Sequence, residues 1–157
     1  MLAAYPGRRR SCCIAIVAGV LIAFQLETSI NPAHADEIIA ISDAWVPANE
    51  QVGSNVALSM TIKNQSDTAD ALLRVRCPAA NFAVKHTVDR GEGAPAMREV
   101  SAIPIAAGGT TVLKPDAYHV MLLQTRQALA AGDAFNCSIV FQKAGTIETE
   151  VKVQQRP

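Results

Sequence analysis

Short segments in which apolar and polar residues alternate fill the chain from residue 37 onward, and this pattern constrains the fold more than any other feature. The segments are rich in β-branched residues, and turn signals such as Gly108-Gly109 and Gly132-Asp133 separate them. Only 127–131 has a helical or turn-like character. The pattern predicts an all-β fold, a β-sandwich or barrel of about eight strands. The predicted strands are 38–46, 55–64, 71–77, 82–88, 110–113, 118–123, 134–141 and 146–153.

The first 35 residues have a different composition. Three arginines at 8–10 precede an uncharged, mostly apolar run at 12–24, and Ala-His-Ala follows at 33–35. This order is typical of a secretory signal peptide, with cleavage expected before Asp36. The rival interpretation is a membrane anchor, but the apolar run is shorter than the ~20 residues that span a bilayer as a helix. We therefore expect an exported, periplasmic protein, with the Sec and twin-arginine routes both open.

The remaining chain, residues 36–157, has the length of one domain and contains neither an internal repeat nor a low-complexity linker. Basic and acidic residues balance at 14 each over the whole chain, and aromatic residues make up 4%. A protein that binds nucleic acid usually has a basic surface or aromatic side chains on which bases stack, so we expect no nucleic-acid partner. We also expect no membrane insertion of the mature domain.

The soft metal-ligating side chains of the predicted mature domain cluster in its middle. His119 and Met121 are two residues apart on a predicted strand, so both side chains project from the same face. His86 lies on another predicted strand, and Met97 lies on the Gly-rich connection that follows it. Met60 belongs to an alternating strand, and we assign it to the core.

These ligand types select the metal. Thioether sulfur is soft and uncharged and so favours Cu(I), while imidazole suits both oxidation states of copper and lets a site tolerate Cu(II). No cluster of carboxylates offers a site for a hard cation. A single methionine or histidine is more often structural than functional, so the prediction of a copper site depends on the joint pattern.

The spacing of the four residues resembles a known signature. His86, ten residues, Met97, twenty-one residues and then His119-Val120-Met121 match the H-x10-M-x21-H-x-M signature of the periplasmic PCuAC-type copper chaperones. The resemblance extends over about residues 42–153 and includes Asp-Ala-Trp-Val-Pro near the mature start. Many relatives have a methionine just after the first histidine, where this chain has threonine and valine.

The resemblance implies a cupredoxin-like β-sandwich that binds Cu(I) near its surface through His86, Met97, His119 and Met121. It further implies delivery of copper toward the CuA or CuB centre of cytochrome c oxidase, alongside Sco-type copper proteins. The alternative is a periplasmic protein for copper storage or tolerance that has no dedicated oxidase client.

Three other function classes fit less well. A blue-copper electron carrier needs a cysteine thiolate among its ligands, and Cys137 is not followed by the usual histidine. An acyl-transfer enzyme needs a nucleophile beside a histidine, and no such motif is present, so we expect no enzyme. A purely structural or adhesive β-sandwich would bind no stoichiometric metal.

Cys77 and Cys137 favour one disulfide. The alternative is a free thiol that acts as an extra copper ligand.

Overall fold

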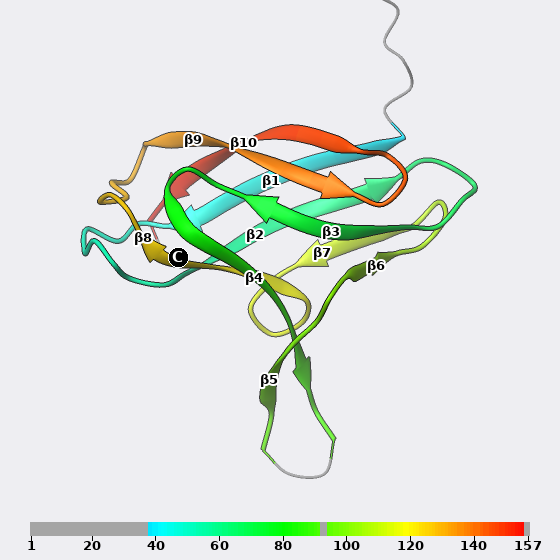
Figure 1. Ribbon diagram of the computed structural model, residues 1–157, viewed down its shortest axis with the longest axis horizontal. Coiled ribbons are helices and arrows are strands. Elements are labelled where there is room, and N and C mark those ends of the chain that lie inside the picture. Colours follow the sequence, from blue (N-terminus) through cyan, green and yellow to red (C-terminus); the bar gives the residue numbers. More distant parts are fainter. Residues whose placement is uncertain (1–37, 92–93, 156–157) are drawn as a thin grey trace, which may run out of the picture. The chain divides into compact units, whose positions relative to one another are not determined.

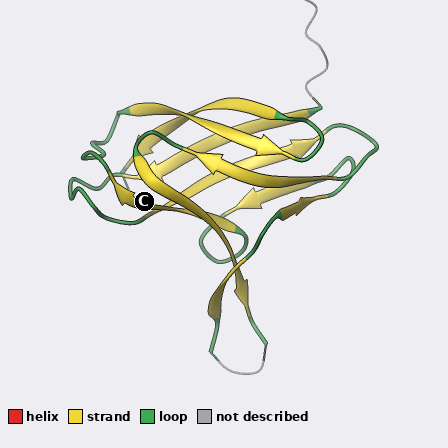
Figure 2. Cartoon of the chain, viewed as in Figure 1, coloured by secondary structure: helices red, strands yellow, loops and turns green. Residues whose placement is uncertain are grey.

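The computed structural model describes residues 38–91 and 94–155, and this part of the chain is all β (Figures 1 and 2). It contains no helix, and therefore no helix long and apolar enough to cross a membrane. The predicted signal peptide and its cleavage point lie outside the described residues and stay predictions. The strands are β1 (Ile39–Pro47), β2 (Val56–Asn64), β3 (Asp70–Arg76), β4 (Ala80–Asp89), β5 (Ala96–Glu99), β6 (Ile103–Ile105), β7 (Thr110–Leu113), β8 (His119–Thr125), β9 (Ala134–Phe141) and β10 (Thr146–Gln154).

The strands form two layers that share β2. One layer has the order β5-β4-β8-β2, and the other continues from β2 through β1, β10, β9 and β3 to β6. The two halves of β2 have different partners on the same side, because 56–58 pairs with β8 and 60–63 pairs with β7. In the described part of the chain, all strand pairs are antiparallel except β1 with β10. The predicted β-sandwich is confirmed.

Alternation along β2 shows how the sequence builds the core. Val56, Leu58, Met60 and Ile62 all point inward and are at most 4% exposed. Burying side chains of this size stabilises the fold by roughly 1.5–3 kcal/mol each. The assignment of Met60 to the core is confirmed.

All eight predicted strands are present, with ends that differ by at most two residues. Two short strands, β5 and β6, were not predicted. The placement of Met97 on the Gly-rich connection after the strand of His86 was therefore wrong, because Met97 lies on β5. Residues 127–131 form no helix; Leu129 instead makes an isolated bridge with Asn49 and is fully buried.

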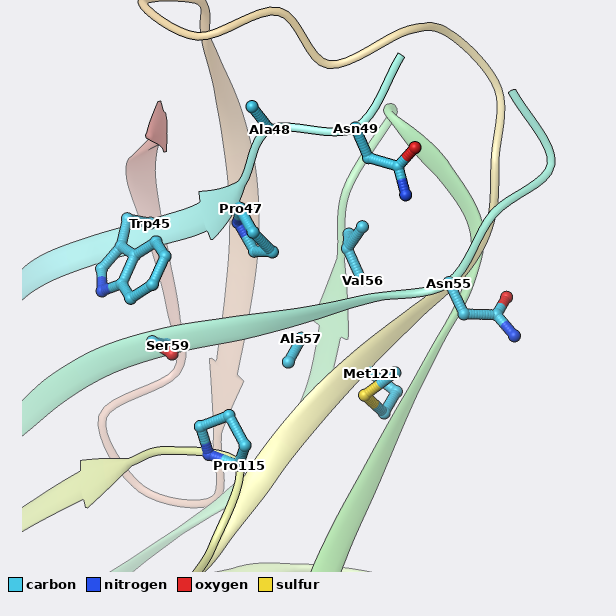
Figure 3. Close-up of a pocket in the computed structure, with 10 residues that line it drawn as sticks. All are labelled: Trp45, Pro47, Ala48, Asn49, Asn55, Val56, Ala57, Ser59, Pro115 and Met121. Carbon is cyan, nitrogen blue, oxygen red and sulfur yellow. The ribbon is translucent and has the colours of Figure 1, made fainter. Parts of the chain in front are cut away.

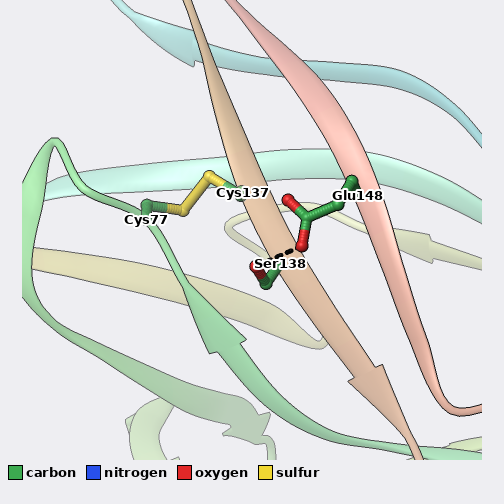
Figure 4. Close-up of a disulfide and its surroundings, with 4 residues drawn as sticks. All are labelled: Cys77, Cys137, Ser138 and Glu148. Carbon is green, nitrogen blue, oxygen red and sulfur yellow. Dashed lines mark hydrogen bonds between the residues drawn. A yellow bond between two sulfur atoms is a disulfide. The ribbon is translucent and has the colours of Figure 1, made fainter.

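A disulfide joins Cys77, just after β3, to Cys137 on β9 (Figure 4). Both cysteines are buried. The bond closes a loop with a sequence separation of 60, which on the chain-entropy model stabilises the fold by about 4 kcal/mol. Neither sulfur is a free thiolate, so the alternative of a cysteine ligand to copper was wrong.

Asp70 fixes the end of the β9–β10 hairpin to β3. Its buried carboxylate accepts backbone hydrogen bonds from Ala71 at 2.7 Å and from Lys143 and Ala144 at 2.9 Å each. Burial by itself raises the pKa of Asp70, but the backbone N–H groups around it outweigh burial and hold that pKa below its ordinary value.

We expect Asp70→Asn to lower the free energy of unfolding at pH 7 by about 1–3 kcal/mol, because an amide NH₂ cannot accept all of these bonds. The carboxylate's contribution is complete above the pKa of an unfolded aspartate, about 3.9, and is lost as the pH falls through the lower folded-state pKa. Urea unfolding of both proteins between pH 7 and pH 2 measures this difference. If the difference in free energy of unfolding between the two proteins stayed constant over this pH range, it would contradict the stabilising role of the Asp70 carboxylate.

Candidate metal centre

The centre begins with two histidines on neighbouring strands. His86 on β4 is the direct cross-strand partner of His119 on β8. Directly opposed residues of an antiparallel pair project from the same face, and here the two imidazoles stack with their centroids 5.5 Å apart and their planes at 25°. The structure thus brings together the first and third residues of the sequence signature.

The opposite face of β8 belongs to the core. Val120 and Leu122 are completely buried, so the alternating residues His119 and Met121 lie on the outer face of the layer. His119 is nevertheless only 1% exposed. His86 stacks against it, and the 114–118 loop folds back far enough to make a hydrogen bond with its ring.

That hydrogen bond prepares His119 as a ligand. Nδ1 of His119 lies 3.0 Å from the carbonyl oxygen of Ala117, to which its N–H donates. A neutral imidazole that donates from Nδ1 has an unprotonated Nε2, whose lone pair is then directed away from the loop. A backbone carbonyl in this role is the usual partner that orients a metal-ligating histidine.

His86 carries an unsatisfied polar atom. Its Nδ1 is buried and has no hydrogen-bond partner among the described residues. A buried polar atom of this kind costs about 1–3 kcal/mol unless a partner is supplied. A metal ion bound at this nitrogen would supply one, so the atom fits the chemistry of the predicted donor set.

The two methionines flank the histidine pair. Met121 follows His119 by two residues and lies opposite Val84 on β4, whereas Met97 on β5 lies opposite Val88. Val84 and Val88 precede and follow His86 by two residues, so all of these side chains share one outer face, here called the ligand face. Met97 is a diagonal neighbour of His86, at roughly 7–8 Å between backbones. The structure therefore sets one thioether at each end of the histidine pair.

The exposure of the thioethers differs. Met97 is 65% exposed on an edge strand, while Met121 is half-buried. Met121 also forms one side of a hollow of about 290 Å³, which Trp45 bounds on the other side (Figure 3). The small side chains of Ala57 and Ser59 lie between them and leave this space open.

Carboxylates do not complete the centre. Among the described residues, no three of histidine, cysteine, aspartate and glutamate come together in a group that could hold a metal. Glu99 on β5 is the direct register partner of His86. Burial lowers the pKa of Lys85, and the Glu99 carboxylate partly opposes that effect.

The carbonyl of Ala117 was not among the residues predicted from the sequence. It acts through its backbone, so no pattern of side chains could have marked it. Its position depends on a tight turn in which Ala117 donates to the carbonyl of Lys114 and Lys114 donates to that of Tyr118. The residues Lys114-Pro115 are a turn signal, which is the only trace of this geometry in the sequence.

Comparison with known proteins places the chain in a family. The model of the LpqE-like family, described as "Putative lipoprotein LpqE-like", matches residues 39–153. The chain belongs to the LpqE-like family. A relative from Leifsonia xyli subsp. xyli, "Putative lipoprotein Lxx21020", is 27% identical over 126 residues, which are 79% of this chain and 74% of the relative.

Two solved structures of similar fold are of copper-bound proteins. The copper-bound PCuAC domain from PmoF2 has a TM-score of 0.66 at 22% identity, covering 76% of this chain and 94% of that domain. The Cu(I) form of DR1885 from Deinococcus radiodurans has a TM-score of 0.64 at 27% identity, covering 79% of this chain and 83% of the other. The chain therefore has the PCuAC fold.

The unpartnered Nδ1 leads to a prediction for the metal-free protein. His86→Phe keeps a planar ring against His119 but removes the buried nitrogen. We expect the variant to be as stable as the wild type or more stable by up to about 1 kcal/mol, because a desolvated polar atom is removed. Chemical denaturation after metal removal by a chelator measures this. A clear loss of stability would show that His86 has a structural partner.

Proposed function

We propose that the protein is a periplasmic copper carrier that binds Cu(I) through His86, Met97, His119 and Met121. One observation carries the proposal: two stacked histidines, one with a buried unpartnered nitrogen and one with its tautomer fixed, lie between two methionines on one face. Two imidazoles and two thioethers form an uncharged, soft set, which favours Cu(I) over harder cations. The copper-bound forms of two proteins with a similar fold, PmoF2 and DR1885, support the same metal.

The gradient of exposure across the four ligands favours a carrier. His119 is buried and held by the Ala117 carbonyl, whereas Met97 is largely exposed. An incoming ligand of another protein would replace Met97 first, because that thioether is the most accessible donor. Stepwise replacement lets the ion move without ever being fully hydrated. We therefore propose a carrier and not a catalyst.

Location and client are further parts of the proposal. The signal-like residues 1–35 and the lipoprotein descriptions of the family and of the Leifsonia relative support an exported protein. We propose cytochrome c oxidase, directly or through a Sco-type protein, as the destination of the copper. This step depends on the sequence resemblance to PCuAC-type chaperones.

Anaerobic titration with Cu(I) in competition with a chromophoric chelator tests the ligand set. We expect one tightly bound ion, and affinities lowered at least about tenfold in Met97→Ala and His119→Ala, because each removes a donor atom. Met60→Leu is the matched control, because Met60 is a buried core methionine, and its affinity for copper should equal that of the wild type. Wild-type affinity in both ligand variants would refute the proposed site.

Deletion of the gene in the organism that encodes it tests the delivery of copper to the oxidase. We expect lowered cytochrome oxidase activity when copper is scarce, and recovery when copper is added, because excess copper bypasses a carrier. A strain that expresses Met97→Ala should resemble the deletion strain. Normal oxidase activity together with copper sensitivity would instead support the alternative of storage or tolerance.

A further inference from the structure

Met97 lies on a two-stranded arm that extends beyond the sandwich. The arm consists of residues 87–91 at the end of β4 and 94–99 around β5, and Figure 1 shows it projecting away from the two layers. β5 pairs only with β4, and its other edge has no partner strand in the described part of the chain. An ion pair between Arg98 and Asp89 holds the arm together internally. It does not connect the arm to the rest of the protein.

A side-chain hydrogen bond connects the arm to a loop of the sandwich. The guanidinium of Arg90 donates through Nη2 to the backbone carbonyl of Asp116, at 2.9 Å. Asp116 belongs to the 114–118 loop, which is closed by two backbone hydrogen bonds and by a 3.3 Å ion pair between Lys114 and Asp116. The next carbonyl along this loop, that of Ala117, is the one that accepts from His119.

We propose that Arg90 is a positioning residue that couples the arm bearing Met97 to the loop that orients His119. This inference rests on the proposed copper site. Among the described residues, the Arg90 side chain makes no hydrogen bond to any of the four ligands; it acts by holding one thioether and one imidazole in a fixed relation. Preorganised ligands lose less conformational entropy when they bind, so the contact strengthens Cu(I) binding through Met97.

The sign of the expected effect separates this role from simple electrostatics. A cationic side chain near the site repels Cu(I), so loss of its charge alone would strengthen binding. Loss of a positioning contact weakens binding. Because the hydrogen bond is exposed, its removal should leave the thermal stability of the metal-free protein almost unchanged.

The experiment compares Cu(I) affinity in Arg90→Ala, Arg90→Lys and Arg98→Ala. We expect Arg90→Ala to bind about twofold to fivefold more weakly, the loss that an exposed charged contact worth up to about 1 kcal/mol can cause. Arg90→Lys keeps one cationic donor for a single carbonyl and should recover most of the affinity. Arg98→Ala removes the same charge from the same arm without breaking the contact to the loop, so it should bind Cu(I) at least as tightly as the wild type.

A double-mutant cycle and a spectroscopic measurement test whether Arg90 affects Cu(I) binding through Met97. In a Met97→Ala background, Arg90→Ala should cause no further loss of affinity. X-ray absorption at the copper edge should show fewer sulfur neighbours in Arg90→Ala than in the wild type. Unchanged affinity of Arg90→Ala, or an equal loss with and without Met97, would overturn the inference. Absence of Cu(I) binding by the wild type would instead refute the proposed function, so the two failures are distinguishable.

Discussion

The pairing of β4 with β8 is the constraint on which the candidate centre depends. Its register sets His86 opposite His119, and the same register places Val84 beside Met121 and carries β4 onward to pair with β5. A shift by one residue would turn the His119 face of β8 into the core and expose Val120 in its place. The complete burial of Val120 and Leu122 therefore fixes the ligand face, because a shift by any odd number of residues would expose both.

The rest of the sandwich keeps this register in place while leaving the ligand face open. The Cys77–Cys137 disulfide and the Asp70 carboxylate both act in the other layer, where they tie β3 to β9 and to the turn before β10. The ligand face is restrained more lightly, by the 114–118 loop and by Arg90. A rigid layer behind an accessible ligand face suits the proposed carrier, because the ligands must be held in register and yet be exchangeable.

The sequence predicted most of the fold because most strands have one buried face. β2 and β9 alternate clearly, and their limits were predicted to within one residue. β5 was missed because all four of its residues are exposed, which leaves no alternation to detect. β6 was missed because it has three residues with a proline in the middle, and proline within a short run counts against a strand.

The sequence by itself determined the all-β class, the assignment of Met60 to the core, and the set of residues to consider as copper ligands. Alternation and ligand chemistry are local properties, so they can be read along one strand or from one side chain. The tertiary structure alone decided that the two histidines stack, that Cys77 and Cys137 bond to each other, and that Met97 lies on a strand held by Arg90. These facts depend on contacts between segments far apart in the chain, which the pairing of strands creates and no local pattern encodes.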